Sequence, residues 1–301
     1  MRSNLQAKSR PYIFASPSWI VIMLIVVFPI IYTIYISFTN FNIYHWTNYR
    51  LIGGSNYLTA LTAVGKGGFA SALGCTIIWT VVNMALQIVI AVTLALMLNV
   101  KGLKFSGLYK TLLMVPWAMP GYISAIIWRN GMFHYDFGLI SYALRGLGLE
   151  PVDWLNHSVP AFIACMMVNL WLALPFMILV VYGGLQSIDN AYYEMAEMEG
   201  AGLITRITKI TIPLLKPILF PAAILTALLT FKQFDIFFLL TMQRGAKTGA
   251  NINTVLTYVY ENVFITSNYG YSAAVSAIIF IIITFFVAAS RKYLREKGEV
   301  Y

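Results

Sequence analysis

Six runs of about 20 mostly apolar residues recur along this chain of 301 residues and restrict its fold more than any other feature. An α-helix rises about 1.5 Å per residue, so each run is long enough to cross roughly 30 Å of hydrocarbon. None of the runs alternates with the two-residue period of a membrane β-barrel. The sequence therefore predicts an all-α integral membrane protein with six transmembrane helices. We expect them over residues 19–38, 71–98, 108–128, 160–185, 218–241 and 271–293.

The composition excludes most soluble proteins. Hydrophobic residues make up 59% of the chain and charged residues 10%, which rules out a cytosolic enzyme and a secreted disulfide-rich module. Cys75 and Cys165 both lie inside apolar runs without a second cysteine at metal-binding spacing, so we expect buried thiols and no metal site.

The distribution of Lys and Arg predicts the orientation. With the N-terminus in the cytoplasm, 13 of the 20 basic residues fall on the cytoplasmic side and six on the other side, while Lys232 lies inside the fifth run. The positive-inside rule then places both termini in the cytoplasm, as tails 1–18 and 294–301 around a six-helix domain, 19–293. The charges stand in small groups at membrane edges, so we expect the lipid bilayer, and no nucleic acid, as a partner.

The segment between the fourth and fifth runs, residues 186–217, is longer than a simple connection needs. Asp189 can cap a short helix over 191–198, and Gly200 and Gly202 would end it. A second short amphipathic helix is expected to stop before Pro213. On these grounds alone the segment is either a peripheral helix in the lipid headgroups or an element with a function of its own.

Part of this segment resembles a known signature. Residues 194–201, Glu-Met-Ala-Glu-Met-Glu-Gly-Ala, together with the Ile-Thr-Ile-Pro at 210–213 and Pro217, resemble the EAA signature of binding-protein-dependent ABC importer permeases. Met195, Glu199 and Ile212 stand where Ala, Asp and Leu are usual. The resemblance extends over nearly the whole chain and is closest to the carbohydrate branch, the maltose and glycerol-phosphate type. It includes Ser37-Phe38-Thr39, Pro116-Trp117, Ile127-Trp128-Arg129, the Gly-Leu-Gln-Ser-Ile at 184–188, and 231–241.

The resemblance implies a type I ABC importer (MetI-like) architecture in a bacterial or archaeal plasma membrane. Segment 186–217 would then be a coupling helix that binds an ATPase subunit through Glu194, Ala196, Glu199, Gly200 and Ala201. The chain itself would be no enzyme and bind no cofactor, because ATP and Mg would be held by two ATP-binding subunits. Its one Gly-Lys pair, Gly65-Lys66, lacks the upstream glycine of a phosphate-binding loop. A second homologous permease, an extracytoplasmic solute-binding protein and a carbohydrate substrate complete the expected partners.

A sugar requires hydrogen-bonding and aromatic side chains at membrane depth. Thr226, Thr230, Gln233 and Phe237 are spaced by four, three and four residues, which places them on one face of the fifth helix if that helix is continuous. By their distance from the signature, several residues correspond to the sugar contacts of the maltose-type permease. They are Asn169, Ala173, Thr226, Thr230 and Gln233.

Several of these residues allow a structural interpretation as well. Thr and Asn in membrane helices often bind a backbone carbonyl or a neighbouring helix, the role we expect for Asn83 and Gln87. Trp117 and Tyr122 are either stacking faces for a sugar or part of an interfacial aromatic belt.

Lys232 and Asp235 form an i,i+3 pair in the fifth run. They predict an ion pair, mutual or between subunits, or else a gate or a contact to an acidic sugar. Pro116 and Pro120 predict a kink in the third run.

Two other function classes remain as alternatives. An ion-coupled secondary carrier or channel would need carboxylates along several runs, and only Asp235 lies deep in one. A membrane enzyme would need a catalytic dyad or metal cluster, whereas His45, His134 and His157 are scattered over the outer loops.

Overall fold

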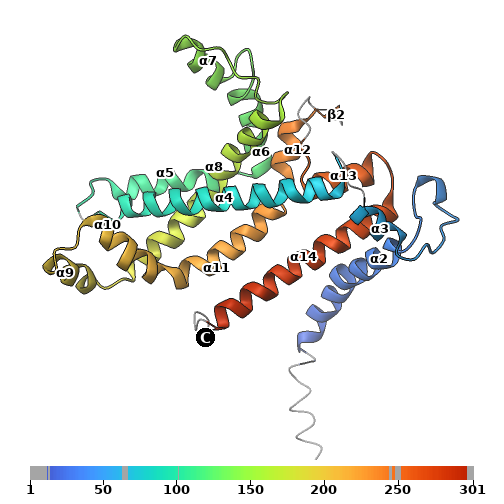
Figure 1. The fold of residues 1–301 in the computed structure, drawn as a ribbon, viewed down its shortest axis with the longest axis horizontal. Helices are drawn as coiled ribbons and strands as arrows, with labels where there is room; N and C mark the ends of the chain where they lie inside the picture. The colour runs from blue at the N-terminus through green and yellow to red at the C-terminus, as the bar shows by residue number, and fades with distance from the viewer. Residues whose placement is uncertain are drawn as a thin grey trace, which may run out of the picture. The chain divides into compact units, whose positions relative to one another are not determined.

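A computed structural model describes residues 12, 14–62, 67–100, 102–243, 246–247 and 252–296, with the side chains of 242–247 and 293–296 left out. Gly65 and Lys66 therefore lie outside the described residues. Nearly all the elements described are helices, as Figure 1 shows. One small antiparallel pair, β1 (Met242–Gln243) and β2 (Ala246–Lys247), is present as well. The prediction of an all-α architecture is confirmed.

Five helices in the described part of the chain are long and apolar enough to cross a membrane, and they overlap five of the predicted runs. Their apolar stretches bury backbone polar groups within their own helical hydrogen bonds, as hydrocarbon requires. They are Phe14–Ser37, which contains η1 (Met23–Val27) and α2 (Phe28–Ser37); α4 (Phe69–Leu98); α8 (Ser158–Gln186); the composite Leu203–Thr241; and Tyr269–Lys292 within α14 (Tyr269–Glu296).

The third run is broken instead of gently kinked. α5 (Ser106–Ala118) and a second helix, α6 (Gly121–Ile127) continuing as the π-helix η3 (Trp128–Met132), meet at 95°. Met119 and Pro120 between them have extended backbones, because proline disfavours the helical conformation of the residue before it. A 13-residue helix is about 20 Å long, so α5 does not cross the membrane alone. The predicted kink is confirmed, and the pair counts as a sixth span only if its two arms are taken together.

The fifth run also differs from the expectation. The second short helix of segment 186–217 does not end before Pro213: α10 (Leu203–Arg206) passes through the π-helix η4 (Ile207–Thr211) directly into α11 (Ile212–Phe231). That expectation was wrong because the π-turn shifts the backbone hydrogen bonds just ahead of the proline, which then occupies the first turn of α11, where its missing N–H is tolerated. α11 stops at Phe231, and α12 (Asp235–Thr241) begins after a short break.

The chain divides into two compact units, Met1–Ala70 with Val259–Ile282, and Ser71–Tyr258 with Ile283–Tyr301. In the first unit, the loop after α2 is fixed to the start of α14 by a hydrogen bond from Gly270 N to Phe41 O of 2.8 Å. The Asn56 side-chain amide donates to the carbonyls of Ser37 and Thr39. The short helices η2 (Ile43–His45) and α3 (Ser55–Thr62) also belong to this unit, whereas α13 (Val255–Phe264) has residues in both units.

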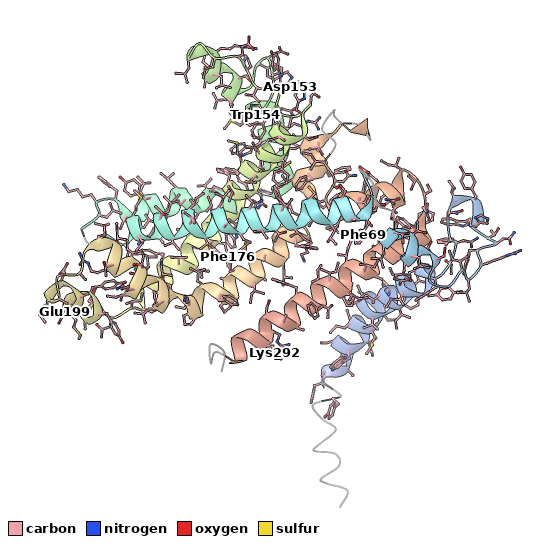
Figure 2. The ribbon with its side chains drawn as sticks, in the orientation of Figure 1. Phe69, Asp153, Trp154, Phe176, Glu199 and Lys292 are labelled. Carbon is pink, nitrogen blue, oxygen red and sulfur yellow. The ribbon has the colours of Figure 1, made fainter. Side chains whose placement is uncertain are left out.

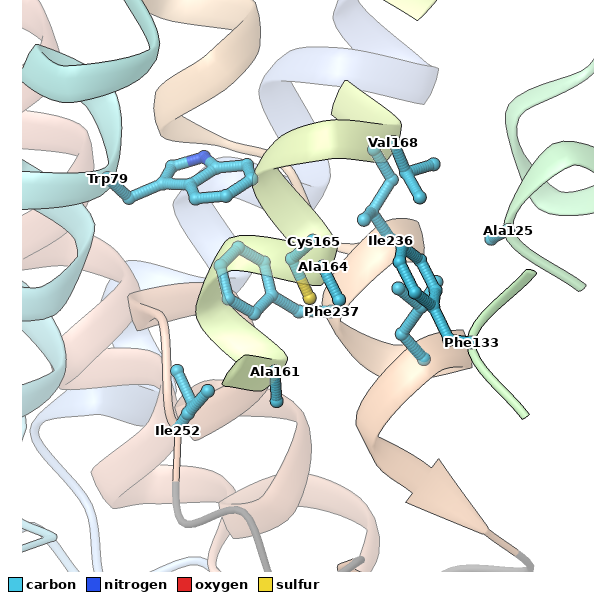
Figure 3. Packing of buried hydrophobic residues seen from close by; sticks show 11 residues of the cluster. Trp79, Ala125, Phe133, Ala161, Ala164, Cys165, Val168, Ile236, Phe237 and Ile252 are labelled. Atoms are coloured by element: carbon cyan, nitrogen blue, oxygen red, sulfur yellow. The ribbon is translucent and has the colours of Figure 1, made fainter. Parts of the chain in front are cut away.

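In the second unit α4, α5, α8 and α11 form a bundle, with α9 (Asn190–Met198) and α10 at one end and α7 (Leu139–Gly146) at the other (Figure 1). Towards the α7 end, α12 packs against α6 and α8. Trp79 and Phe237 meet edge to face in the core there, with ring centroids 4.5 Å apart. Figure 3 shows this cluster, to which Ala161, Ala164, Cys165 and Val168 of α8 also belong.

Candidate functional site

The predicted helix of segment 186–217 is present as α9, and its boundaries follow from two residues. At its start the Asp189 carboxylate accepts a hydrogen bond from Ala191 N at 3.0 Å. At its end Gly200 takes a positive φ of 72°, which most side chains disfavour. Gly200 N donates to Glu197 O and Ala201 N to Ala196 O, at 3.0 and 2.8 Å, so the turn is a Schellman motif. The sequence predicted this helix correctly.

Two side-chain contacts that the sequence did not predict fix α9 to the elements that follow it. The Arg206 guanidinium forms a salt bridge with the Glu197 carboxylate. The hydroxyls of Tyr193 and Thr211 lie 3.0 Å apart, which connects α9 to η4. No helical spacing relates the members of either pair, since α9 and α10 are separated by a turn, so sequence periodicity contains no signal for them. α9, α10 and η4, residues 190–211, therefore form one unit that these contacts hold together, and we call it the braced hairpin.

The braced hairpin leaves a different set of side chains exposed. The carboxylates of Glu194 and Glu199 are exposed, and among the residues that the structure describes neither has an ion-pair partner. Met195 and Met198 beside them are also exposed, at 63% and 85% of their surface. Figure 2 shows Glu199 at the tip of this end of the second unit. An exposed surface that combines carboxylates with methionines is suited to a partner with a basic, partly apolar groove.

A groove of about 640 Å³ separates the braced hairpin from the end of α4. Glu194, Glu197 and Arg206 line one side of it, and Asn99 and Val100 line the other. The hairpin therefore does not pack closely against the end of α4, and the chain connects the hairpin to α8 on one side and to α11 on the other.

α8 and α11, the helices on either side of segment 186–217, approach each other closely at Gly184. A Cβ atom added to Gly184 would lie 2.7 Å from Leu215 Cδ2 and 3.3 Å from Ile218 Cδ1. Small residues permit such close approach between membrane helices. Gly184 and Leu215 therefore join the two helices next to the hairpin that they carry.

The predicted polar residues at membrane depth fall into a buried group and an exposed group. In the buried group, Asn169 Nδ2 donates to Asn83 Oδ1 at 2.9 Å, and Asn83 Nδ2 donates to Trp79 O at 2.9 Å. Trp79 Nε1 donates to Thr230 O at 3.1 Å. This polar relay links α8, α4 and α11, so Asn83 has the helix-packing role that we expected. Gln87, one turn further along α4, is buried and its amide has no partner among the described residues.

The expected single face from Thr226 to Phe237 does not exist, because the helix is interrupted between Phe231 and Asp235. Thr226 is buried and its hydroxyl donates to Ala222 O at 2.9 Å. Phe237 is fully buried in the core beside Trp79. The role of the threonines in substrate binding stays a prediction.

The exposed group contains the aromatic candidates. Trp117 and Tyr122, on the two arms of the broken span, are 60% and 56% exposed. Gln233 and Ala173 are half-buried. Lys232 and Asp235 are both exposed and do not pair with each other in the part of the chain that the structure describes, so a mutual ion pair is absent and a partner in another subunit stays a prediction.

The chain matches a known protein family. Residues 87–297 match the family described as the binding-protein-dependent transport system inner membrane component. The match includes α8, the braced hairpin and α11, and begins after Trp79 and Asn83 of the polar relay.

Individual relatives extend over the whole chain. The trehalose/maltose transport system permease protein MalF of Thermococcus litoralis is 32% identical, and the match covers 99% of this chain and 100% of that protein. The galactooligosaccharides transport system permease protein GanP of Bacillus subtilis is 28% identical over 92% of this chain and 68% of its own length. The sulfoquinovosyl glycerol permease protein SmoG of Agrobacterium fabrum is 30% identical over 94% of this chain and 89% of its own.

Solved structures share the fold. A chain of the bacterial alginate ABC transporter, crystallised with a periplasmic protein bound to an alginate pentasaccharide, superposes with a TM-score of 0.80. The match covers 98% of this chain and 97% of the other, at 19% sequence identity. At that identity the likeness establishes the architecture alone.

Proposed function

The chain belongs to the binding-protein-dependent transport system inner membrane components, the non-catalytic permeases of ABC importers, and from this premise we propose that it imports a sugar, oligosaccharide or related polyol. It is a multi-pass protein of a prokaryotic inner membrane. The carbohydrate substrates named for its full-length relatives support the substrate class. Both termini would lie in the cytoplasm, on the side that carries the braced hairpin.

The single observation that carries the mechanism is the braced hairpin with its exposed carboxylates. We propose that two ATP-binding subunits, which hold the ATP and Mg that this chain lacks motifs for, dock on α9 through Glu194, Ala196, Glu199, Gly200 and Ala201. Because Arg206 and Tyr193 fix α9 to α10 and η4, and η4 continues into α11, a displacement of the hairpin moves α11 as well. Closure of the ATPases on ATP would thus shift the permease between inward-facing and outward-facing states.

The translocation path would form against a second homologous permease, and an extracytoplasmic binding protein would deliver the substrate. Trp117 and Tyr122 support this arrangement, since their rings are more than half exposed on this chain and offer stacking faces to a sugar. Gln233 and Ala173, half-buried, would lie beside them, and Lys232 and Asp235 would pair with the second permease or gate the path. Asn169, Thr226 and Thr230 would reach the substrate only if the helices around the polar relay separate.

A pair of glycine variants tests the coupling role. Gly200→Val places a β-branched side chain at a φ of 72° and should distort the Schellman turn, whereas Gly202→Val meets open space at ordinary backbone angles. We expect Gly200→Val to lower substrate uptake at least tenfold while ATPase activity becomes uncoupled from it or the ATPase subunits no longer co-purify. Gly202→Val should transport normally.

A charge reversal tests the same surface without altering the backbone. Glu194→Lys should have the same effect as Gly200→Val, and Glu150→Lys, on the opposite side of the predicted membrane, should have none. Normal coupled uptake by both Gly200→Val and Glu194→Lys would refute the coupling role. Transport by the purified chain alone, driven by an ion gradient, would instead favour the secondary carrier.

A further inference from the structure

We infer that this permease binds the phosphate group of an anionic phospholipid through Lys110, Tyr182 and Gln186. These residues lie where α5 packs against α8, near the end of the bundle that carries the braced hairpin. The cluster takes no part in the proposed coupling or substrate contacts. The inference depends on the membrane location of the chain and not on the identity of its substrate.

The side chains of Lys110 and Gln186 both contact the hydroxyl group of Tyr182. Lys110 Nζ donates to Tyr182 Oη at 2.6 Å and lies 4.2 Å from the centre of the tyrosine ring. Gln186 Nε2 donates to the same oxygen at 2.7 Å. The cation is thereby held over the aromatic face, which favours a fixed ammonium position.

The hydrogen-bonding capacity of this cluster is unbalanced. The ammonium of Lys110 has three N–H donors and the amide of Gln186 two, and their contacts with Tyr182 use one of each. The hydroxyl oxygen of Tyr182 already accepts two hydrogen bonds, so its own proton must point to a further acceptor. Among the described residues no carboxylate pairs with Lys110. A phosphate group, with several acceptor oxygens, fits this surplus of donors.

The surroundings indicate a lipid and not a free phosphate. One turn deeper into the bundle, the cluster borders a narrow apolar slot between α4, α5 and α8, lined by Leu98, Leu113, Met114, Pro175, Ile178 and Leu179. Charged donors at the membrane edge above apolar side chains match a phospholipid, whose phosphate lies at that depth and whose acyl chain points inwards. The slot itself measures only about 10 Å³, so the acyl chain would lie along its rim, where Leu179 is 41% exposed on the chain.

Occupation of this site would connect α5 to the end of α8. Gln186 is the last residue of α8, immediately before the braced hairpin. A phosphate that binds Lys110 and Gln186 together would hold that end in place.

The test uses the assembled transporter, purified in detergent and titrated with dioleoylphosphatidylglycerol or dioleoylphosphatidylcholine, with bound lipids counted by native mass spectrometry. Lys110→Met should weaken phosphatidylglycerol binding about tenfold, the scale of one lost charge-assisted contact. Tyr182→Phe keeps the ring but removes the hydroxyl and should weaken it several-fold. Lys104→Met, an equal loss of charge at an exposed position just before α5, should change it less than about twofold. Phosphatidylcholine binding should not change.

Three results would overturn the inference. Equal losses in Lys110→Met and Lys104→Met would mean that the lipid responds to general surface charge. Displacement of phosphatidylglycerol by millimolar inorganic phosphate, leaving no requirement for the acyl chain, would assign the cluster to a free anion. Loss of the ATPase subunits from the purified Lys110→Met complex would assign this surface to a protein contact.

Discussion

Replacing Gly184 tests how tightly α8 and α11 are joined beside the hairpin. The Cβ atom of any other residue would lie 2.7 Å from Leu215 Cδ2, about 1.2 Å closer than an ordinary carbon contact. Leu215 is buried and must rotate off its rotamer or move α11 to make room, at a cost of about 1 kcal/mol for Ala. Val adds two methyl groups at the same place, and overpacking of that kind costs about 1–3 kcal/mol.

A matched control separates this clash from the effect of valine on the helix itself. Gly183 is the preceding residue of the same helix, and a Cβ added there meets nothing within 4 Å. Gly183→Val and Gly184→Val change helix propensity by the same amount, so the difference between them reports the contact. We expect the midpoint of thermal unfolding of the purified transporter to be about 3–8 °C lower for Gly184→Val than for Gly183→Val.

Two outcomes decide this prediction. Addition of Leu215→Ala should restore much of the loss in Gly184→Val, because it removes the atoms that clash. If the two valine variants unfold within about 1 °C of each other, or if Leu215→Ala makes Gly184→Val worse by its full single-variant cost, α8 and α11 are not in close contact at Gly184 and the reasoning fails.

Two further predictions address the side-chain contacts of the second unit. Trp79→Phe keeps an aromatic ring but removes the donor to the buried Thr230 carbonyl, which should destabilise the protein by about 1–3 kcal/mol. An unfolding midpoint equal to that of the parent protein would show that the hydrogen bond contributes nothing. Arg206→Gln breaks the partly exposed salt bridge with Glu197, which stabilises the fold by no more than about 1 kcal/mol, so thermal unfolding should hardly change. The ratio of substrate imported to ATP hydrolysed should fall. An unchanged ratio would mean that this salt bridge does not transmit motion.

Hydropathy and local capping chemistry were sufficient for much of the fold. The long apolar runs predicted α4 and α8 to within two residues at each end, because hydrocarbon leaves a helix as the only way to satisfy the backbone. Asp189 and Gly200 predicted the limits of α9, since capping depends on the residues at the cap itself.

Features that depend on the path of the backbone were not predictable in the same way. Pro213 was expected to end a helix, but a π-turn over Ile207–Thr211 accommodates it, and no local residue pattern distinguishes that turn from an α-helical one. The break after Phe231 has a local signal in the sequence, because Asp235 is an acidic residue in the first turn of α12, where the helix dipole favours it. Pro120 predicted a kink in the third run, but a proline does not determine the size of the angle, here 95°.

The candidate site shows the limit of sequence reasoning most clearly. Asn169 was a candidate from its distance to the signature and Trp117 from its aromatic ring at membrane depth, yet Asn169 is 5% exposed and Trp117 60%. Burial depends on which helix covers a side chain, and periodicity within one helix does not contain that information. A spacing argument therefore selects residues that can face a path but not those that do.

The difference in burial leads to a consequence for substrate selection. The amide of Asn169 is already committed to Asn83, and both belong to the relay that joins α4, α8 and α11. Replacing Asn169 leaves the Asn83 oxygen without its donor inside the bundle, so loss of transport in such a variant follows from helix packing whether or not a sugar ever touches it. Trp117 and Tyr122 are more than half exposed, so we expect that their replacement can change the sugar preference without breaking the relay. Specificity should therefore be sought first at the broken span.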